Sequence, residues 1–194
     1  MKTAAAAWLF FLTASVGHAE IVSEYTDFDA DSGCGVHRMA DEGDGDWADL
    51  ACGGYRGYPV LLSYTDLRET IFYGFPPEGE LPRQPGFHPF NHAGPRIEWR
   101  IDRQERSETP FAAIHRWFVA AGGEGRSDTE ILVVSKVAGL ADRAGCFVGY
   151  VMASGNPGAN VEAREMADAN ARDFACGTDA PEYSDSAIRD LVSQ

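Results

Sequence analysis

The stretch that most constrains the fold runs from Cys146 to Cys176, CFVGYVMASGNPGANVEAREMADANARDFAC. It predicts a strand over residues 146–153, a tight turn, and a helix over residues 157–176 with Asn156 as N-cap and Pro157 in the first helical position. The strand advances by roughly 26 Å, and the helix returns by roughly 30 Å. The two cysteines therefore meet at one end of the unit, where a disulfide can join them.

The predicted helix carries a stripe of small residues. Alanines 163, 167 and 171 and Phe174 recur at helical spacing, while most charged residues lie elsewhere on the helical surface. Such a stripe lets a helix lie close to a sheet. Gly177 is a natural residue to follow the helix end, and Asp168 with Arg172 has the favourable order for an ion pair one turn apart.

Residues 1–19, MKTAAAAWLFFLTASVGHA, are typical of a secretory signal peptide, because a cationic start at Lys2 precedes an apolar run and a small residue, Ala19. A membrane anchor is the alternative, but the run is shorter than the roughly 20 residues that span a bilayer. We expect cleavage, no membrane insertion and a periplasmic or secreted location. Residues 20–194 would then form a single α+β domain, with 178–194 as a flexible tail or a short helix from Ser186.

The chain is strongly acidic, with a formal charge of −14. Removing residues 1–19 takes away one basic residue and no acidic one, so the charge becomes −15. Such a surface repels nucleic acid and anionic lipid and favours a cationic partner, such as a cationic protein. Solubility alone is the alternative explanation.

Four cysteines in an exported chain predict two disulfides, although four cysteines allow three connectivities. The strand and helix geometry favours Cys146 with Cys176, which leaves Cys34 with Cys52. Zinc is disfavoured because the sequence has no CxxC spacing. No thiol is then left for catalysis.

Apolar runs and alternation predict strands over residues 21–28, 58–64, 70–74, 96–103, 111–120, 129–137 and 146–153. In 96–103, Ile97, Trp99 and Ile101 share the face expected in the core, and the opposite face is expected to be wet or to bind a ligand. Strands in succession followed by one helix predict an α+β fold: an antiparallel, curved sheet of about six strands with the C-terminal helix packed on it.

Candidate metal sites are weak. Asp27, Asp29 and Asp31 have the first spacings of a calcium-binding EF-hand loop, but Ser32 stands where the glycine belongs and Arg38 where the glutamate belongs. A solvated acidic loop between Cys34 and Cys52 is favoured over ion binding there. In the proline-rich segment 75–95, Pro89 separates His88 from His92, which disfavours a helix that would present both as metal ligands. We expect no metal and no cofactor.

No specific catalytic pattern is present. Ser154, in MASGNPG, lacks the first glycine of a nucleophile elbow. His115 shares a strand face with Phe111, Ala113 and Trp117, so a hydrogen-bonded core histidine is favoured over a catalytic base.

Several segments resemble a family of uncharacterised exported proteins of Alphaproteobacteria. They are CGGYRGYPV, SYTDLRE, FYGF, FNHAGPRIEWR, PFAAIHRW, ILVVSKV, CFVGYVMASGNPGANVEAREMAD and FACG, which cover nearly the whole mature chain. The resemblance implies a periplasmic or secreted location. It supplies no activity and no functional residues.

Two functions follow as hypotheses. The first is a non-enzymatic binding or inhibitor-like protein, whose ligand-binding residues we predict to be Tyr55, Arg68, Glu98 and Arg100. The alternative is an envelope hydrolase that uses His115 as its base.

Overall fold

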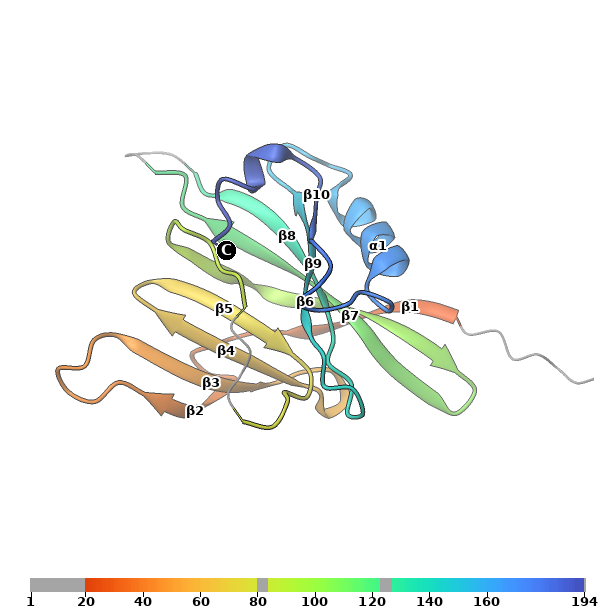
Figure 1. Cartoon of the computed structure of the whole chain (residues 1–194), viewed down its shortest axis with the longest axis horizontal. Helices are drawn as coiled ribbons and strands as arrows, with labels where there is room; N and C mark the ends of the chain where they lie inside the picture. The colour runs from red at the N-terminus through yellow and green to blue at the C-terminus, as the bar shows by residue number, and fades with distance from the viewer. Residues whose placement is uncertain (1–19, 80–83, 123–126, 194) are drawn as a thin grey trace, which may run out of the picture.

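The computed structural model describes residues 20–79, 84–122 and 127–193 (Figure 1). The predicted signal peptide, residues 1–19, lies outside the described residues. The elements, in chain order, are β1 (Glu20–Asp27), β2 (Cys34–Met39), β3 (Trp47–Gly53), the 3-10 helix η1 (Tyr55–Gly57), β4 (Pro59–Thr65), β5 (Arg68–Tyr73), β6 (Asn91–Gln104), β7 (Ser107–Val119), β8 (Thr129–Lys136), β9 (Cys146–Met152), α1 (Ala159–Asn170), β10 (Glu182–Tyr183) and the 3-10 helix η2 (Ser186–Ile188).

The strands form two open sheets. A six-stranded sheet has the order β1, β6, β7, β8, β9, β10, and a four-stranded sheet has the order β2, β3, β4, β5. All neighbours pair antiparallel except the short β10, which runs parallel to β9. The predicted α+β class with an antiparallel sheet and one helix is confirmed. The second sheet was not predicted, because β2 and β3 lie in the acidic segment that we expected to be a loop.

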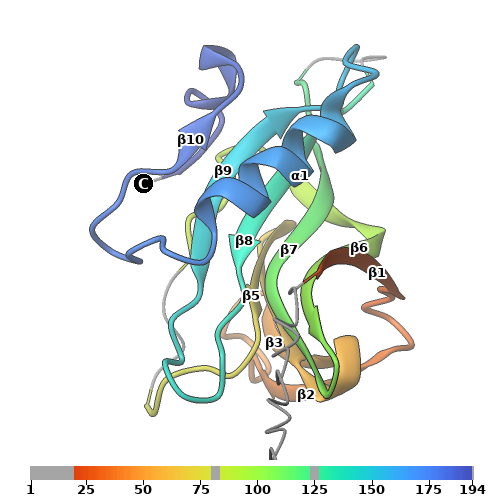
Figure 2. The ribbon, with the colours of Figure 1, turned by 90° about the vertical axis from the view of Figure 1, so that its right-hand side faces the viewer.

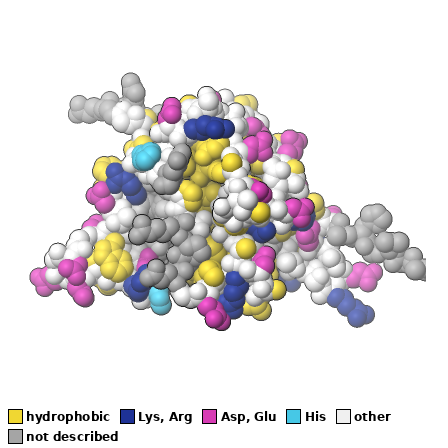
Figure 3. All heavy atoms as spheres, viewed as in Figure 1, with side chains coloured by type: hydrophobic (Ala, Val, Ile, Leu, Met, Phe, Trp, Pro, Cys, Tyr) yellow, Lys and Arg dark blue, Asp and Glu magenta, His cyan; other side chains and the backbone are white. Residues whose placement is uncertain are grey.

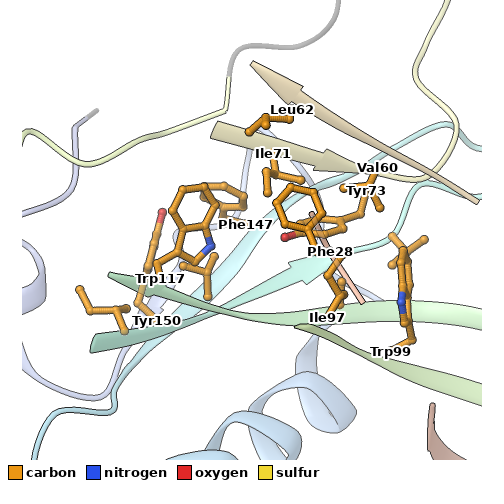
Figure 4. Packing of buried hydrophobic residues seen from close by; sticks show 14 of the residues in the cluster. Phe28, Val60, Leu62, Ile71, Tyr73, Ile97, Trp99, Trp117, Phe147 and Tyr150 are labelled. Carbon is orange, nitrogen blue, oxygen red and sulfur yellow. The ribbon is translucent and has the colours of Figure 1, made fainter. Parts of the chain in front are cut away.

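The two faces of the six-stranded sheet are covered differently. Helix α1 lies across β7, β8 and β9 on one face, and the four-stranded sheet packs on the other (Figure 2). Between the sheets, Leu62 and Ile71 point toward Ile97 and Trp117 (Figure 4). The predicted inward face of 96–103 is confirmed, since Ile97, Trp99 and Ile101 are all fully buried. Burial of an aliphatic side chain of this size contributes about 2 kcal/mol.

Helix α1 rests on the sheet through its small residues. Ala163, Ala167 and Ala171 are fully buried, as the stripe predicted. The strand beneath leaves no room either: a Cβ on Gly149 would lie 2.4 Å from the sulfur of Met166. This close approach explains why β9 carries a glycine at its centre.

The helix is shorter than predicted. It begins at Ala159, with Gly158 as N-cap, and ends at Asn170. The side chain of Asn156 instead accepts the Gly158 N–H at 2.9 Å, which forms a turn just before the helix. The chain returns to the sheet through turns after Ala171, so Gly177, with φ of +83°, closes a turn beyond the helix.

Both predicted disulfides are present. Cys146 and Cys176 are joined with their Cα atoms 5.7 Å apart, and Cys34 and Cys52 with theirs 4.1 Å apart. Cys34 lies directly opposite Cys52 in the β2–β3 pair, so this second bridge clamps two strands.

The predicted hairpin over 58–74 is formed by β4 and β5. Its two turn residues, Asp66 and Leu67, have φ of +47° and +60°, as a two-residue hairpin turn with the twist of the strands requires.

The C-terminal segment holds the proline-rich segment in place. Phe87 bridges to Val192, and Gly86 exchanges hydrogen bonds with Ser193. The short helix predicted from Ser186 is η2, and its Ile188 is fully buried. No helix among the described residues is both long and apolar enough to cross a membrane.

Candidate functional site

The outer face of β6, where we predicted a binding surface, lies under α1. Glu98 is 7% exposed and Arg100 is 8% exposed. Arg164 donates to Glu98 at 2.6 Å, and Arg100 donates to both carboxylate oxygens of Asp168 at 2.8 and 2.6 Å. These two predicted ligand-binding residues thus pair with side chains of the helix.

A third pair extends the same row. Arg172 donates to both carboxylate oxygens of Asp102, at 2.9 and 2.6 Å. Alternate strand residues are roughly 6.6 Å apart, and helical residues four apart are roughly 6 Å apart. The strand charges at 98, 100 and 102 therefore match the charges at 164 and 168 on α1 and at 172 in the turn directly after it, and the three pairs form a salt-bridge ladder between β6 and the helical segment.

The ladder changes the predicted pairing within the helix. The Asp168 carboxylate faces Arg100. Arg172 hydrogen-bonds to Asp168 through the backbone carbonyl, at 3.1 Å, and not through the carboxylate. Hydrogen bonding to Glu98 raises the pKa of Arg164, and hydrogen bonding to Asp102 raises the pKa of Arg172. Both guanidiniums stay charged in the ladder.

Tyr55 and Arg68 lie away from the ladder and from each other. The Tyr55 ring packs in the core between the sheets, and its hydroxyl donates to Glu108 at 2.6 Å. Arg68 donates to the Asp66 carboxylate at 2.6 Å and lies over the Phe90 ring, 4.8 Å from its centre. The structure therefore does not bring the four predicted ligand-binding residues together.

His115 is a buried core histidine. It is 0% exposed, and its ring contacts Phe28 and Trp117. Its Nε2 lies 2.6 Å from the carbonyl of Gly94 and its Nδ1 lies 2.8 Å from the hydroxyl of Tyr73. A carbonyl can only accept, so Nε2 carries the proton and Nδ1 accepts from Tyr73. Burial lowers the pKa of His115 to about 4, so the ring is neutral.

The acidic residues before β2 make local turns. The Asp29 carboxylate accepts from the backbone of Asp31 and from the backbone and hydroxyl of Ser32, and the Ser32 bonds lower its pKa. Asp27 instead faces Arg96. Within ranges 20–79, 84–122 and 127–193, no group of three or more histidine, cysteine, aspartate or glutamate residues could hold a metal ion.

A groove of about 680 Å³ opens between the sheets, beside the ends of β6 and β7. We call it the inter-sheet groove. Its floor is the inner face of the four-stranded sheet, where Ala48, Leu50 and Leu62 continue the core outward. The full lining is Ala30, Asp31, Cys34, Val36, Ala48, Leu50, Leu62, Tyr64, Leu67, Glu69, Phe90, Asn91, His92, Phe118, Ala120 and Asp128.

Large apolar side chains border the groove and face solvent. Val36 is 61% exposed, Leu67 60% and Phe90 47%. On the face seen in Figure 3, acidic side chains lie mostly toward the margins and hydrophobic ones reach the surface nearer the middle. A concave, mostly apolar hollow with a few polar groups is the usual form of a small-molecule site.

Three of the polar side chains that line the groove are carboxylates, beside Tyr64, Asn91 and His92. Glu69 is half-buried, and its Oε2 accepts the Ala93 N–H at 2.7 Å. Desolvation raises the pKa of Glu69 most, the Ala93 hydrogen bond and nearby His92 lower it, and Asp31 raises it. Asp128 is the third carboxylate. Among the described lining residues none is lysine or arginine.

The sequence prediction missed this groove. Its lining comes from six separate stretches of the chain, so no local pattern in the sequence predicts it. Comparisons with protein-family models, with curated proteins and with solved structures give no match to this chain.

Proposed function

We propose that this protein is an exported, non-enzymatic binding protein and that its ligand occupies the inter-sheet groove. The observation that carries the proposal is the groove itself. Its volume of about 680 Å³ falls within the roughly 300–1,000 Å³ of typical ligand sites. A ligand that covers the solvent-facing apolar side chains at its border is stabilised in the complex by roughly 25 cal/mol for each Å² of apolar surface removed from water.

Binding is favoured over the hydrolase alternative by the state of His115. A general base must come within hydrogen-bond reach of the proton it removes. His115 is fully enclosed, and both ring nitrogens are already occupied by Tyr73 and Gly94.

An exported location is supported by two features. Residues 1–19 have the pattern of a secretory signal peptide. Both disulfides are of the kind that persists in oxidising compartments.

The test uses the neutral fluorescent probe N-phenyl-1-naphthylamine with two matched variants. Ala48→Phe fills the groove floor, whereas Ala51→Phe adds the same ring on the exposed, opposite face of β3. We expect saturable probe fluorescence with the native protein and with Ala51→Phe, and at least a tenfold loss of affinity with Ala48→Phe. Equal binding by both variants, or none by the native protein, would refute the proposal.

A further inference from the structure

We infer that the ligand of the inter-sheet groove is a small amphiphilic cation, with an apolar body against the groove walls and a protonated amine paired with Glu69. This inference rests on the proposed function and adds the chemical class of the ligand.

The walls require an apolar body. Leu50 and Phe118 line the groove, and Leu67 and Phe90 extend it toward solvent. A simple hydrated cation would leave these surfaces in contact with water. An alkyl or aryl group covers them and removes apolar area from water.

The charges of the described lining residues favour a positive group. Glu69, Asp31 and Asp128 place three carboxylates around the hollow. The guanidinium of Arg68, which lies over Phe90, is paired with Asp66 on its own turn. A ligand carboxylate would be repelled here, whereas an ammonium is attracted.

Glu69 is the best placed of the three carboxylates. Its Oε2 is fixed by the Ala93 N–H, and the structure gives Oε1 no hydrogen-bond partner among the described residues. Glu69 is half-buried, so part of the water that would otherwise solvate its carboxylate is removed, and this desolvation raises the pKa of Glu69. An ammonium donor replaces the lost hydration, and charge-assisted hydrogen bonds are among the stronger ones in proteins.

The size of the groove favours a small molecule over a protein segment. The site is a single hollow of about 680 Å³, a volume typical of small-molecule sites, whereas stable protein interfaces are broad surfaces.

The experiment compares three ligands of equal chain length by calorimetry on the purified, disulfide-bonded protein at about pH 7.5, where carboxyl groups are ordinarily ionised. The probes are octylammonium, 1-octanol and octanoate, with ammonium chloride to test the charge alone. We expect octylammonium to bind at least tenfold more tightly than 1-octanol, and octanoate and ammonium chloride not to bind.

Glu69→Gln removes the charge and keeps an acceptor for the Ala93 N–H. We expect this variant to bind octylammonium about tenfold more weakly and to bind 1-octanol with unchanged affinity. Glu105→Gln is the matched control, since this exposed glutamate lies in the turn at the far end of β6. The native-protein comparison does not depend on either variant folding.

The outcomes separate the two proposals. Equal binding of octylammonium and 1-octanol, both blocked by Ala48→Phe, would overturn the cationic ligand and leave the binding groove standing. Binding of acetyl-Leu-Lys-Leu-amide in place of octylammonium would overturn the small molecule in favour of a basic protein segment. Failure of every probe would overturn both.

Discussion

Acid should destabilise this protein through one buried residue, His115. In the folded protein burial holds its pKa at about 4, against 6.5 for an ordinary histidine. Between these values the unfolded chain binds a proton that the folded protein does not. Stability from this group is therefore fully present above about pH 6.5 and is lost as the pH falls toward about 4.

The size of the effect follows from the two pKa values. Their full difference, at about 1.4 kcal/mol for each pH unit, corresponds to about 3 kcal/mol. Between about pH 7 and about pH 4.5 the loss amounts to about 2.5 kcal/mol. A loss of this size is a large fraction of the roughly 5–15 kcal/mol that stabilises a typical domain.

Urea unfolding at these two pH values measures the loss. His115→Gln is the informative variant, because an amide can donate to Gly94 and accept from Tyr73 but does not titrate. We expect the native protein to lose about 2.5 kcal/mol more than this variant, since the many carboxylates contribute equally to both. His37→Gln, at an exposed site on β2, is the control and should follow the native protein. Equal losses in the native protein and His115→Gln would refute the buried neutral imidazole.

Three further predictions concern stability, each measured by urea unfolding. Asp168→Ala should lower the free energy of unfolding by about 2 kcal/mol, because it leaves the nearly buried Arg100 without its ion pair. The double variant with Arg100→Leu should lose less than the sum of the two single variants. Strictly additive losses would contradict the ladder. Replacing Cys146 and Cys176 by serine should cost about 3 to 4 kcal/mol, from a loop of 30 residues; no loss would show that the bridge does not constrain the unfolded chain. Gly74→Ala should lower the free energy of unfolding by more than 1 kcal/mol, because Gly74 has φ of +94° and an added Cβ would lie 2.2 Å from the Ala138 carbonyl oxygen. An unchanged stability would mean that the backbone bridge between Gly74 and Ala138 can shift.

The core was predictable because it depends on local periodicity. Alternation placed Ile97 and Trp99 in the core, and the alanine stripe identified the buried face of α1. The disulfide of Cys146 with Cys176 followed from the lengths of a strand and a helix. These features depend on neighbours in sequence, which one chain displays directly.

The outer face of β6 shows where such reasoning fails. Charges that alternate with apolar residues usually face water, so Glu98 and Arg100 were predicted to form a binding surface. The structure covers them with the helical segment, where each charge has the sign opposite to that of the strand residue it faces. The match of strand residues two apart with helix residues four apart was present in the sequence, and it could have been found by comparing the two segments.

Strands β2 and β3 were missed for a different reason. Their hairpin is rich in aspartate and glycine, which are depleted in strands. Only the inward alternation of Ala48, Leu50 and Cys52 marked β3 as a strand. The inter-sheet groove depends on these strands and on distant segments, so its position could not be read from local patterns.

The most direct test of the binding groove is nitrogen–proton chemical-shift mapping of the native protein during titration with octylammonium. Saturable shifts should gather at the amides of Val36, Leu50, Glu69 and Phe118, which come from both sheets. Shifts centred instead on Glu98 and Arg100, or no saturable shift at all, would contradict the account.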